Sequence, residues 1–267
     1  PILGMEGDDI RVIQTEGSGC YGHNGADDAV LDTALLAREI EGTPISLKWM
    51  RPDELTWEPY GPAMVMKMQA SLGTGNQVIA WNHEVYSYPH LGRPREGGRQ
   101  SDLIASWHLA EPWEKSRRMP IHAPHIGAHR NADPLYVFPQ KRVVKHFVPD
   151  SPLRTSAMRG LGAYGNVFAI ESFMDELANA AGTDPVEFRL RHLKDGRAIA
   201  VIQAAVEKAG WERRQSLEAD RGRGIAFAQY KNRQCYAAVV VDVQVDRHSG
   251  VIQLERAIIA ADAGQII

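Results

Sequence analysis

One stretch of this chain places an arginine and several glycines directly before a predicted helix. Met158, Arg159 and Gly160 are followed by Gly162 and Gly165. Glycine takes positive φ angles at little cost and lets a ligand approach the main chain closely. The stretch therefore has the composition of a turn that could wrap a small anionic ligand.

The helix after this turn is predicted over 166–181. Apolar residues recur at intervals of three and four from Val167 to Ala181, and Asn166 is suited to cap the helix. The free amides and the positive dipole end of such a helix face the residues before it, so Arg159 lies beside a candidate phosphate cradle. An ordinary strand-to-helix turn is the alternative interpretation.

A second glycine-rich stretch occurs near the beginning of the chain. The residues of 16–25 include four glycines around Cys20 and Tyr21, and a helix is predicted over 27–40. Asp27 and Asp28 suit its first turn because carboxylates are stabilised at a helix N-terminus. Two loops of this kind in one chain favour a shared ligand more strongly than either loop does alone.

Three other groups of residues could support different chemistry. The spacing of His122, His125 and His129 would suit a zinc site on a helix, but Pro124 disfavours that helix. Cys20 and His23 could act as a nucleophile and its base, but packing of the thiol is the better interpretation. Carboxylates on the long helix, Glu171, Asp175 and Glu176, are better explained by a solvated face with one buried ion pair than by acid and base catalysis.

Composition is that of a globular chain with no bias toward nucleic acid. Its 267 residues are 44% hydrophobic, carry a net charge of −3 and contain two cysteines, which form no disulfide framework. No apolar run approaches the length of a membrane span. Nothing in the sequence assigns a compartment.

The order of predicted elements indicates an α+β fold with two mixed lobes. The first lobe, 1–150, contains short strands at 10–15 and 44–50, a hairpin of 64–72 and 78–88, and a long loop from 89 to 150. The second lobe, 151–267, contains the Arg-Gly loop, helices and a terminal hairpin. The helices of that lobe are predicted at 166–181, 185–193 and 197–209, and its strands at 224–230, 236–246 and 251–261.

Several motifs together resemble the molybdenum-cofactor-binding large subunit of the xanthine dehydrogenase and aldehyde oxidase family of molybdenum hydroxylases. The branch with isoquinoline 1-oxidoreductase and related bacterial aldehyde or nicotinate dehydrogenases is the most similar. The resemblance covers the whole chain, and its motifs stand at 19–28, 153–162, 168–178, 184–193 and 262–267.

The resemblance implies which residues contact the molybdopterin-type cofactor. Gly19, Cys20, Tyr21 and Gly22 match one loop, with Tyr21 where relatives usually have phenylalanine, and Met158, Arg159 and Gly160 match the other. Gly25 stands near the glutamate of the xanthine-oxidising branch, which argues against a purine substrate.

The resemblance also implies where the catalytic base lies. The catalytic glutamate of relatives belongs to a Gly-x-Gly-Glu motif near the C-terminus, and these 267 residues lack that motif. We therefore expect the glutamate to lie beyond Ile267. No catalytic residue and no metal ligand is assigned within the chain.

The implied parent protein hydroxylates an aldehyde or an N-heteroaromatic compound with oxygen taken from water. Its electrons pass to a small [2Fe–2S] subunit and, in this branch, often to a c-type cytochrome. We interpret the chain as an internal fragment that is truncated at its C-terminus and inactive by itself. The alternatives are a non-catalytic module that holds the cofactor and docks a subunit, and a zinc hydrolase that uses the histidine-rich loop.

Overall fold

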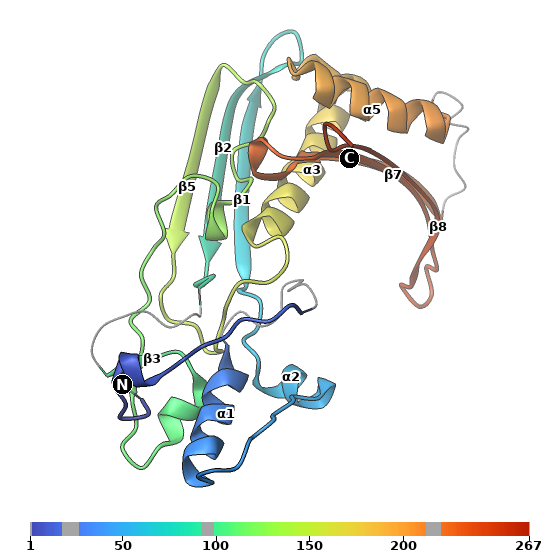
Figure 1. Ribbon diagram of the computed structural model, residues 1–267. Helices are drawn as coiled ribbons and strands as arrows, with labels where there is room; N and C mark the ends of the chain where they lie inside the picture. Colours follow the sequence, from blue (N-terminus) through green and yellow to red (C-terminus); the bar gives the residue numbers. More distant parts are fainter. Residues whose placement is uncertain (1, 18–26, 92–98, 212–219, 267) are drawn as a thin grey trace. The chain divides into compact units, whose positions relative to one another are not determined.

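The computed structural model describes residues 2–17, 27–91, 99–211 and 220–266 (Figure 1). They form two compact units that are interleaved along the chain. Unit 1 contains 1–63, 87–122 and 147–161, and unit 2 contains 64–86, 123–146 and 162–267. The predicted lobe boundary near residue 150 remains a prediction.

Unit 1 has short elements joined by side-chain contacts. Its helices are α1 (Asp28–Glu39) and α2 (Arg51–Trp57), and its two short strands, β3 (Gln100–Ser101) and β4 (Glu114–Lys115), pair in parallel. A 3-10 helix, η2 (Ile104–His108), contacts α1. A backbone bridge joins Tyr60 to Thr155. Because regular pairing is sparse, hydrogen bonds from side chains hold much of this unit together.

The described residues of unit 2 form two three-stranded sheets and three α-helices (Figure 1). One sheet has the order β1-β2-β5 and the other β6-β7-β8, with antiparallel pairing in the second. Helix α3 packs against β1 and β6, and α5 packs against β7 and β8. The strands are β1 (Met64–Leu72), β2 (Val78–Ser87), β5 (Gln140–Phe147), β6 (Arg221–Gln229), β7 (Tyr236–Val245) and β8 (Ile252–Asp262). The helices are α3 (Gly162–Ala180), α4 (Pro185–Arg191) and α5 (Gly196–Ala209).

Local signals explain most of the element ends in unit 2. The Asp184 carboxylate accepts hydrogen bonds from the Val186 and Glu187 amides and caps α4, which begins at the predicted residue 185. Glu187 bonds Arg191 at 2.7 Å instead of completing a capping box. Asp195 caps α5 in the same way, and Gly210 ends that helix with a φ of 65°.

The core of unit 2 is one cluster of apolar side chains with a charged group inside it. Trp81 stacks on Phe138 with ring centroids 4.9 Å apart. Among these apolar residues Arg189, which is fully buried, donates to Glu171 at 2.9 Å. Glu171 also accepts from the Tyr136 hydroxyl and the Phe227 amide, both at 2.9 Å. The predicted buried ion pair on the long helix is therefore present, and the Glu171 carboxylate accepts hydrogen bonds from three different residues.

Three predictions of secondary structure need correction. Residues 10–15 and 44–50 are described and do not pair as strands; Val12 is 84% exposed, because no neighbouring strand covers it. The long loop predicted over 89–150 contains β5, whose charged residues hid its strand pattern. Such charges are usual on a sheet edge, where β5 lies. Helix α3 begins at Gly162 rather than 166, so Asn166 lies inside the helix.

Contacts across β2 and β5 lead to a prediction about pH. Glu84 on β2 bonds Arg142 of β5 at 2.9 Å and Tyr86 at 3.1 Å, and the Arg142 hydrogen bond is the largest cause that lowers its pKa from 4.5 to about 2. The stabilisation from this carboxylate is complete above pH 4.5 and is lost as the pH falls through about 2. We expect Arg142→Gln to raise the pKa of Glu84 toward 4.5 in a ¹³C NMR titration.

A matched change at the neighbouring residue controls for altered surface charge. Lys141 also lies on β5, but it pairs with Asp133 and not with Glu84. Lys141→Gln should therefore leave the Glu84 pKa where it is in the wild type. An unchanged pKa in Arg142→Gln would contradict the assigned cause.

Candidate functional site

The predicted Arg-Gly loop is a tight turn at the end of unit 1. The Leu161 amide donates to the Met158 carbonyl at 2.9 Å, and Gly160 has a φ of +82°. That angle is the reason for glycine here, since a turn of this type needs positive φ at its third residue. Leu161 also has a positive φ, 52°, and the exposed Arg159 occupies the second position of the turn. The chain then enters α3 directly.

The other predicted cofactor loop lies outside the described residues. Gly19, Cys20, Tyr21 and Gly22 belong to it, and their predicted contacts remain predictions. The structure resumes at Asp27, whose φ is 61°, and α1 begins at Asp28. The helix predicted over 27–40 is therefore confirmed as α1.

The position of the catalytic base also remains a prediction. Ile267 lies outside the described residues, and the glutamate is expected beyond it. No geometry is therefore assigned to the base, and the site described below contains the residues predicted to contact the cofactor and their neighbours.

The residues before the Arg-Gly turn are held by backbone contacts within unit 1. The Tyr60 amide donates to the Arg154 carbonyl at 2.9 Å, and the Ser156 amide donates to the Tyr60 carbonyl at 3.1 Å. Thr155 is buried and its hydroxyl donates to the Pro89 carbonyl at 2.9 Å. The side chain of Met158 lies against Gly61, where an added Cβ would come 3.0 Å from Met158 Cγ. The turn therefore starts from a fixed extended segment.

A buried ion pair adds a second attachment to the same segment. Arg154 donates to Asp28 through the two terminal guanidinium nitrogens, Nη1 and Nη2, with N–O distances of 2.9 Å. Bidentate pairing of this kind fixes geometry as well as charge. Both residues belonged to motifs in the sequence, but nothing there indicated that they would meet. Their contact depends on chain segments 126 residues apart.

In unit 2, the start of α3 is fitted closely to the segment around η3 (Gly127–His129). A Cβ on Gly162 would lie 2.5 Å from the Gly127 carbonyl oxygen, so this position has no space for a side chain. Asn166 is fully buried and donates to the Ala128 and Arg130 carbonyls at 2.8 and 2.9 Å. Asn166 is thus an anchor for this segment and not the predicted helix cap.

The same segment is bound on its other side by the turn after β6. The Asn131 side chain donates to the Gln229 carbonyl at 2.8 Å and accepts from the Lys231 amide at 2.9 Å. Arg130 bonds the Tyr230 hydroxyl. Three stretches of unit 2 that are distant in sequence are therefore joined by buried polar side chains.

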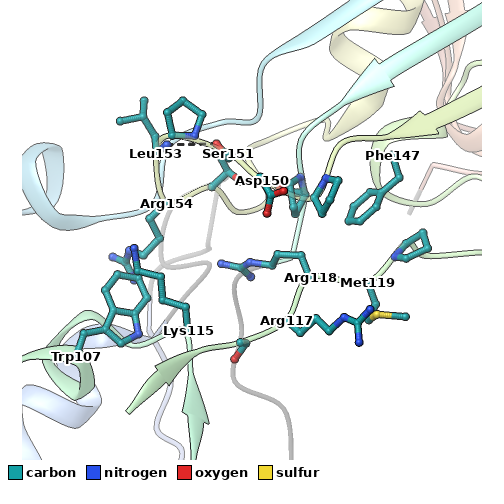
Figure 2. Close-up of a pocket in the computed structure, with 16 residues that line it drawn as sticks. Trp107, Lys115, Arg117, Arg118, Met119, Phe147, Asp150, Ser151, Leu153 and Arg154 are labelled. Carbon is teal, nitrogen blue, oxygen red and sulfur yellow. Dashed lines mark hydrogen bonds between the residues drawn. The ribbon is translucent and has the colours of Figure 1, made fainter. Parts of the chain in front are cut away.

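A cavity of about 710 Å³ lies in unit 1, along the segment that leads to the Arg-Gly turn (Figure 2). Its wall includes Arg118, Arg154, Lys115 and Trp107. Arg118 bonds the buried Asp102 at 2.8 Å, and Arg154 is bound to Asp28. Buried carboxylates thus already balance two of the positive charges, and we assign no ligand to this cavity.

The alternative sites receive little support from the geometry. Within the parts of the chain that the structure describes, no group of three or more His, Cys, Asp or Glu side chains could hold a metal ion. Pro124 precedes only a three-residue 3-10 helix, and His129 bonds the Ala123 carbonyl at 2.8 Å. The described helices also include none that is long and apolar enough to cross a membrane.

Comparison with known proteins finds a family match for the part of the chain that contains the Arg-Gly turn. Residues 121–193 match the family model described as "Molybdopterin cofactor-binding domain". These residues include the Arg-Gly turn, α3 and the segment to which Gly162 and Asn166 are fitted. The chain belongs to the molybdopterin-binding molybdenum hydroxylases.

Two curated relatives align over nearly the whole chain. One is a polypeptide of the nicotinate dehydrogenase of Pseudomonas putida, which is 36% identical over 97% of this chain and 21% of its own length. The other is the beta polypeptide of isoquinoline 1-oxidoreductase from Brevundimonas diminuta, which is 27% identical over 99% of this chain and 31% of its own length. The chain thus spans about a fifth to a third of these relatives.

Solved structures share the fold at low sequence identity. Aldehyde oxidoreductase from Desulfovibrio gigas has a TM-score of 0.54 and 19% identity, over 88% of this chain and 25% of its own. Quinoline 2-oxidoreductase from Pseudomonas putida 86 has a TM-score of 0.54 and 14% identity, over 88% of this chain and 31% of its own. The predicted family, α+β fold class and class of cofactor are therefore confirmed.

Proposed function

We propose that this chain holds one part of the molybdopterin cofactor of a larger oxidoreductase. The parent protein would hydroxylate an aldehyde or an N-heteroaromatic compound with oxygen from water. The observation that carries the proposal is the Arg-Gly turn, which stands inside the region matching the molybdopterin-binding family model. The substrates in the names of the relatives, nicotinate and isoquinoline among them, support the substrate class.

The residues present suit an anionic pterin group. Met158, Arg159 and Gly160 would hold it, with Arg159 as a cationic donor and Gly160 allowing close approach to the backbone. Helix α3 follows at once, and its first turn contains no acidic residue that would repel an anion. Gly19, Cys20, Tyr21 and Gly22 are proposed as the second contact.

The share of these residues in the reaction is binding and orientation. When bound, the cofactor supplies the redox chemistry and the Lewis acidity. This chain supplies donors that fix the pterin and a tight turn that holds them in place. The proton-accepting glutamate would belong to a motif absent from these 267 residues, beyond Ile267. We accordingly expect the isolated chain to be inactive and to act as a cofactor-holding module.

The partners are also part of the proposal. Electrons would leave through a small [2Fe–2S] subunit and from there to a c-type cytochrome. Cys235 is the single cysteine in the described part of the chain, and Cys20 is the only other one in the sequence. Two distant cysteines cannot supply the four ligands that such a cluster usually takes. Iron–sulfur centres would therefore lie on another polypeptide or segment.

The metal and pterin content of the full-length protein tests this function. The protein should be purified from its own host together with its neighbouring subunits. We expect close to one molybdenum and one pterin per large subunit, measured with elemental analysis and with fluorescence of the released pterin. Zinc without pterin would contradict the proposal and support the hydrolase alternative.

A further inference from the structure

Arg154 and Asp28 bond several backbone groups of unit 1 in addition to each other. Asp28 also accepts a hydrogen bond from the Ile104 amide at 2.9 Å, and Arg154 donates to the Asp102 carbonyl at 3.0 Å. Arg154 further bonds the Trp57 carbonyl. The start of α1, the end of α2 and the segment before η2 therefore meet at one guanidinium group.

Because the ion pair between Arg154 and Asp28 is buried, it tolerates little change in either side chain. The side chains of Arg154 and Asp28 are 9% and 3% exposed. A buried charge whose partner is removed loses its compensation and disturbs its surroundings strongly. A planar guanidinium can bond both carboxylate oxygens and two carbonyls at once, whereas a lysine ammonium of shorter reach cannot reproduce that fork.

The pair also stands close in the sequence to both predicted cofactor-binding stretches. Arg154 shortly precedes the Met158–Gly160 turn, and residues 154–156 are extended and bridged to Tyr60. Because each residue spans at most about 3.3–3.6 Å, the position of Arg154 limits where the nearby Met158–Gly160 turn can lie. Asp28 stands shortly after Gly19–Gly22 in the sequence. One ion pair thus fixes chain positions next to both predicted cofactor-binding stretches.

We propose that Arg154 and Asp28 are positioning residues that set the Met158–Gly160 turn for cofactor binding. This inference rests on the proposed function. Neither residue touches the cofactor in this proposal. They act by holding the backbone from which Arg159 and Gly160 present their donors.

The test uses the full-length protein and the variant Arg154→Lys, which keeps the charge and loses the bidentate contact. We expect its pterin and molybdenum content to fall about 10-fold or more, the loss typical when a residue supporting a metal site is changed. Hydrogen exchange of the amides at 156–161 should be faster than in the wild type. Asp28→Glu is the second variant, since it keeps the charge and displaces the carboxylate.

A matched pair elsewhere in the chain separates positioning from general destabilisation. Arg223 bonds Asp242 through two nitrogens, at 2.5 and 3.0 Å, and lies on β6 in unit 2. Arg223→Lys makes the same chemical change in a partly buried Arg–Asp pair. We expect this variant to lose about as much melting temperature as Arg154→Lys and yet to retain the pterin content of the wild type.

Each outcome decides the question. Wild-type cofactor content in both Arg154→Lys and Asp28→Glu would overturn the inference. A loss of cofactor in Arg223→Lys as large as that in Arg154→Lys would also overturn it. A wild-type protein without pterin would overturn the proposed function and the inference with it. Cofactor loss confined to the Arg154 and Asp28 variants would support the inference.

Discussion

Gly162→Ala is expected to destabilise unit 2 by about 2–3 kcal/mol, the upper part of the range for overpacked sites. The new Cβ would lie 2.5 Å from the Gly127 carbonyl oxygen and 2.6 Å from the Ala128 carbonyl carbon. Backbone atoms cannot rotate away as a side chain can. The shift would also disturb the Ala128 carbonyl, which accepts from Asn166. Urea unfolding followed by circular dichroism measures the loss.

Gly165 provides the control on the same helix. Its added Cβ would meet Met64 Sδ and Met66 Cε, each at 3.3 Å, which are atoms near the ends of flexible side chains. Alanine also favours helix over glycine by roughly 0.5–1 kcal/mol. Gly165→Ala should therefore be neutral or slightly stabilising. Equal stability of the two variants would show that α3 is not fitted to the Gly127–Ala128 backbone.

Arg189→Met is expected to cost about 3–5 kcal/mol, because it leaves the buried Glu171 carboxylate without its cation. Arg189 is fully buried and donates to Glu171 at 2.9 Å and to Asp175 at 2.6 Å. Burial already raises the pKa of the Glu171 carboxyl, while the attraction of Arg189 opposes that rise. The double variant Arg189→Met with Glu171→Gln should recover part of the loss, since the unpaired charge is gone.

A neighbouring exposed pair is the control for the Arg189 experiment. Arg191 bonds Glu187 at 2.7 Å on the same helix, α4, where the two side chains are 37% and 65% exposed. Exposed pairs of this spacing contribute only about 0.3–0.5 kcal/mol. Arg191→Met should therefore change the free energy of unfolding very little. Additive losses in the Arg189 and Glu171 double variant would refute the coupling.

The sequence predicted those parts of the fold that depend on neighbouring residues. Asp184 and Asp195 precede apolar helical patterns, and the helices begin beside them. The β1–β2 hairpin and the β7–β8 turn at Arg247–Gly250 were likewise predictable, since turn residues separate two strand patterns. The family motifs identified the Arg-Gly turn, and the structure supplies its backbone geometry.

Features that depend on distant contacts could not be predicted in this way. The charged strand β5 forms because β2 offers it a partner, with Arg142 meeting Glu84 across the sheet. Helix α3 begins at Gly162, before the predicted residue 166, where the Gly127–Ala128 backbone lies against the chain. The same limit applies to Arg154 and Asp28. Their residue types indicated a turn and a helix start, but only the folded chain brings them together.

Interleaving of the two units has a consequence for how such a protein is made and inherited. Neither unit corresponds to one continuous length of the gene, because each is assembled from three separated stretches. During synthesis, the β1–β2 hairpin leaves the ribosome long before β5, which pairs with β2, and α3, which packs against β1. Recombination that exchanged a single block of sequence could not replace either unit completely without also replacing part of the other. The two units are therefore expected to be passed on, and to mature after translation, as one inseparable pair.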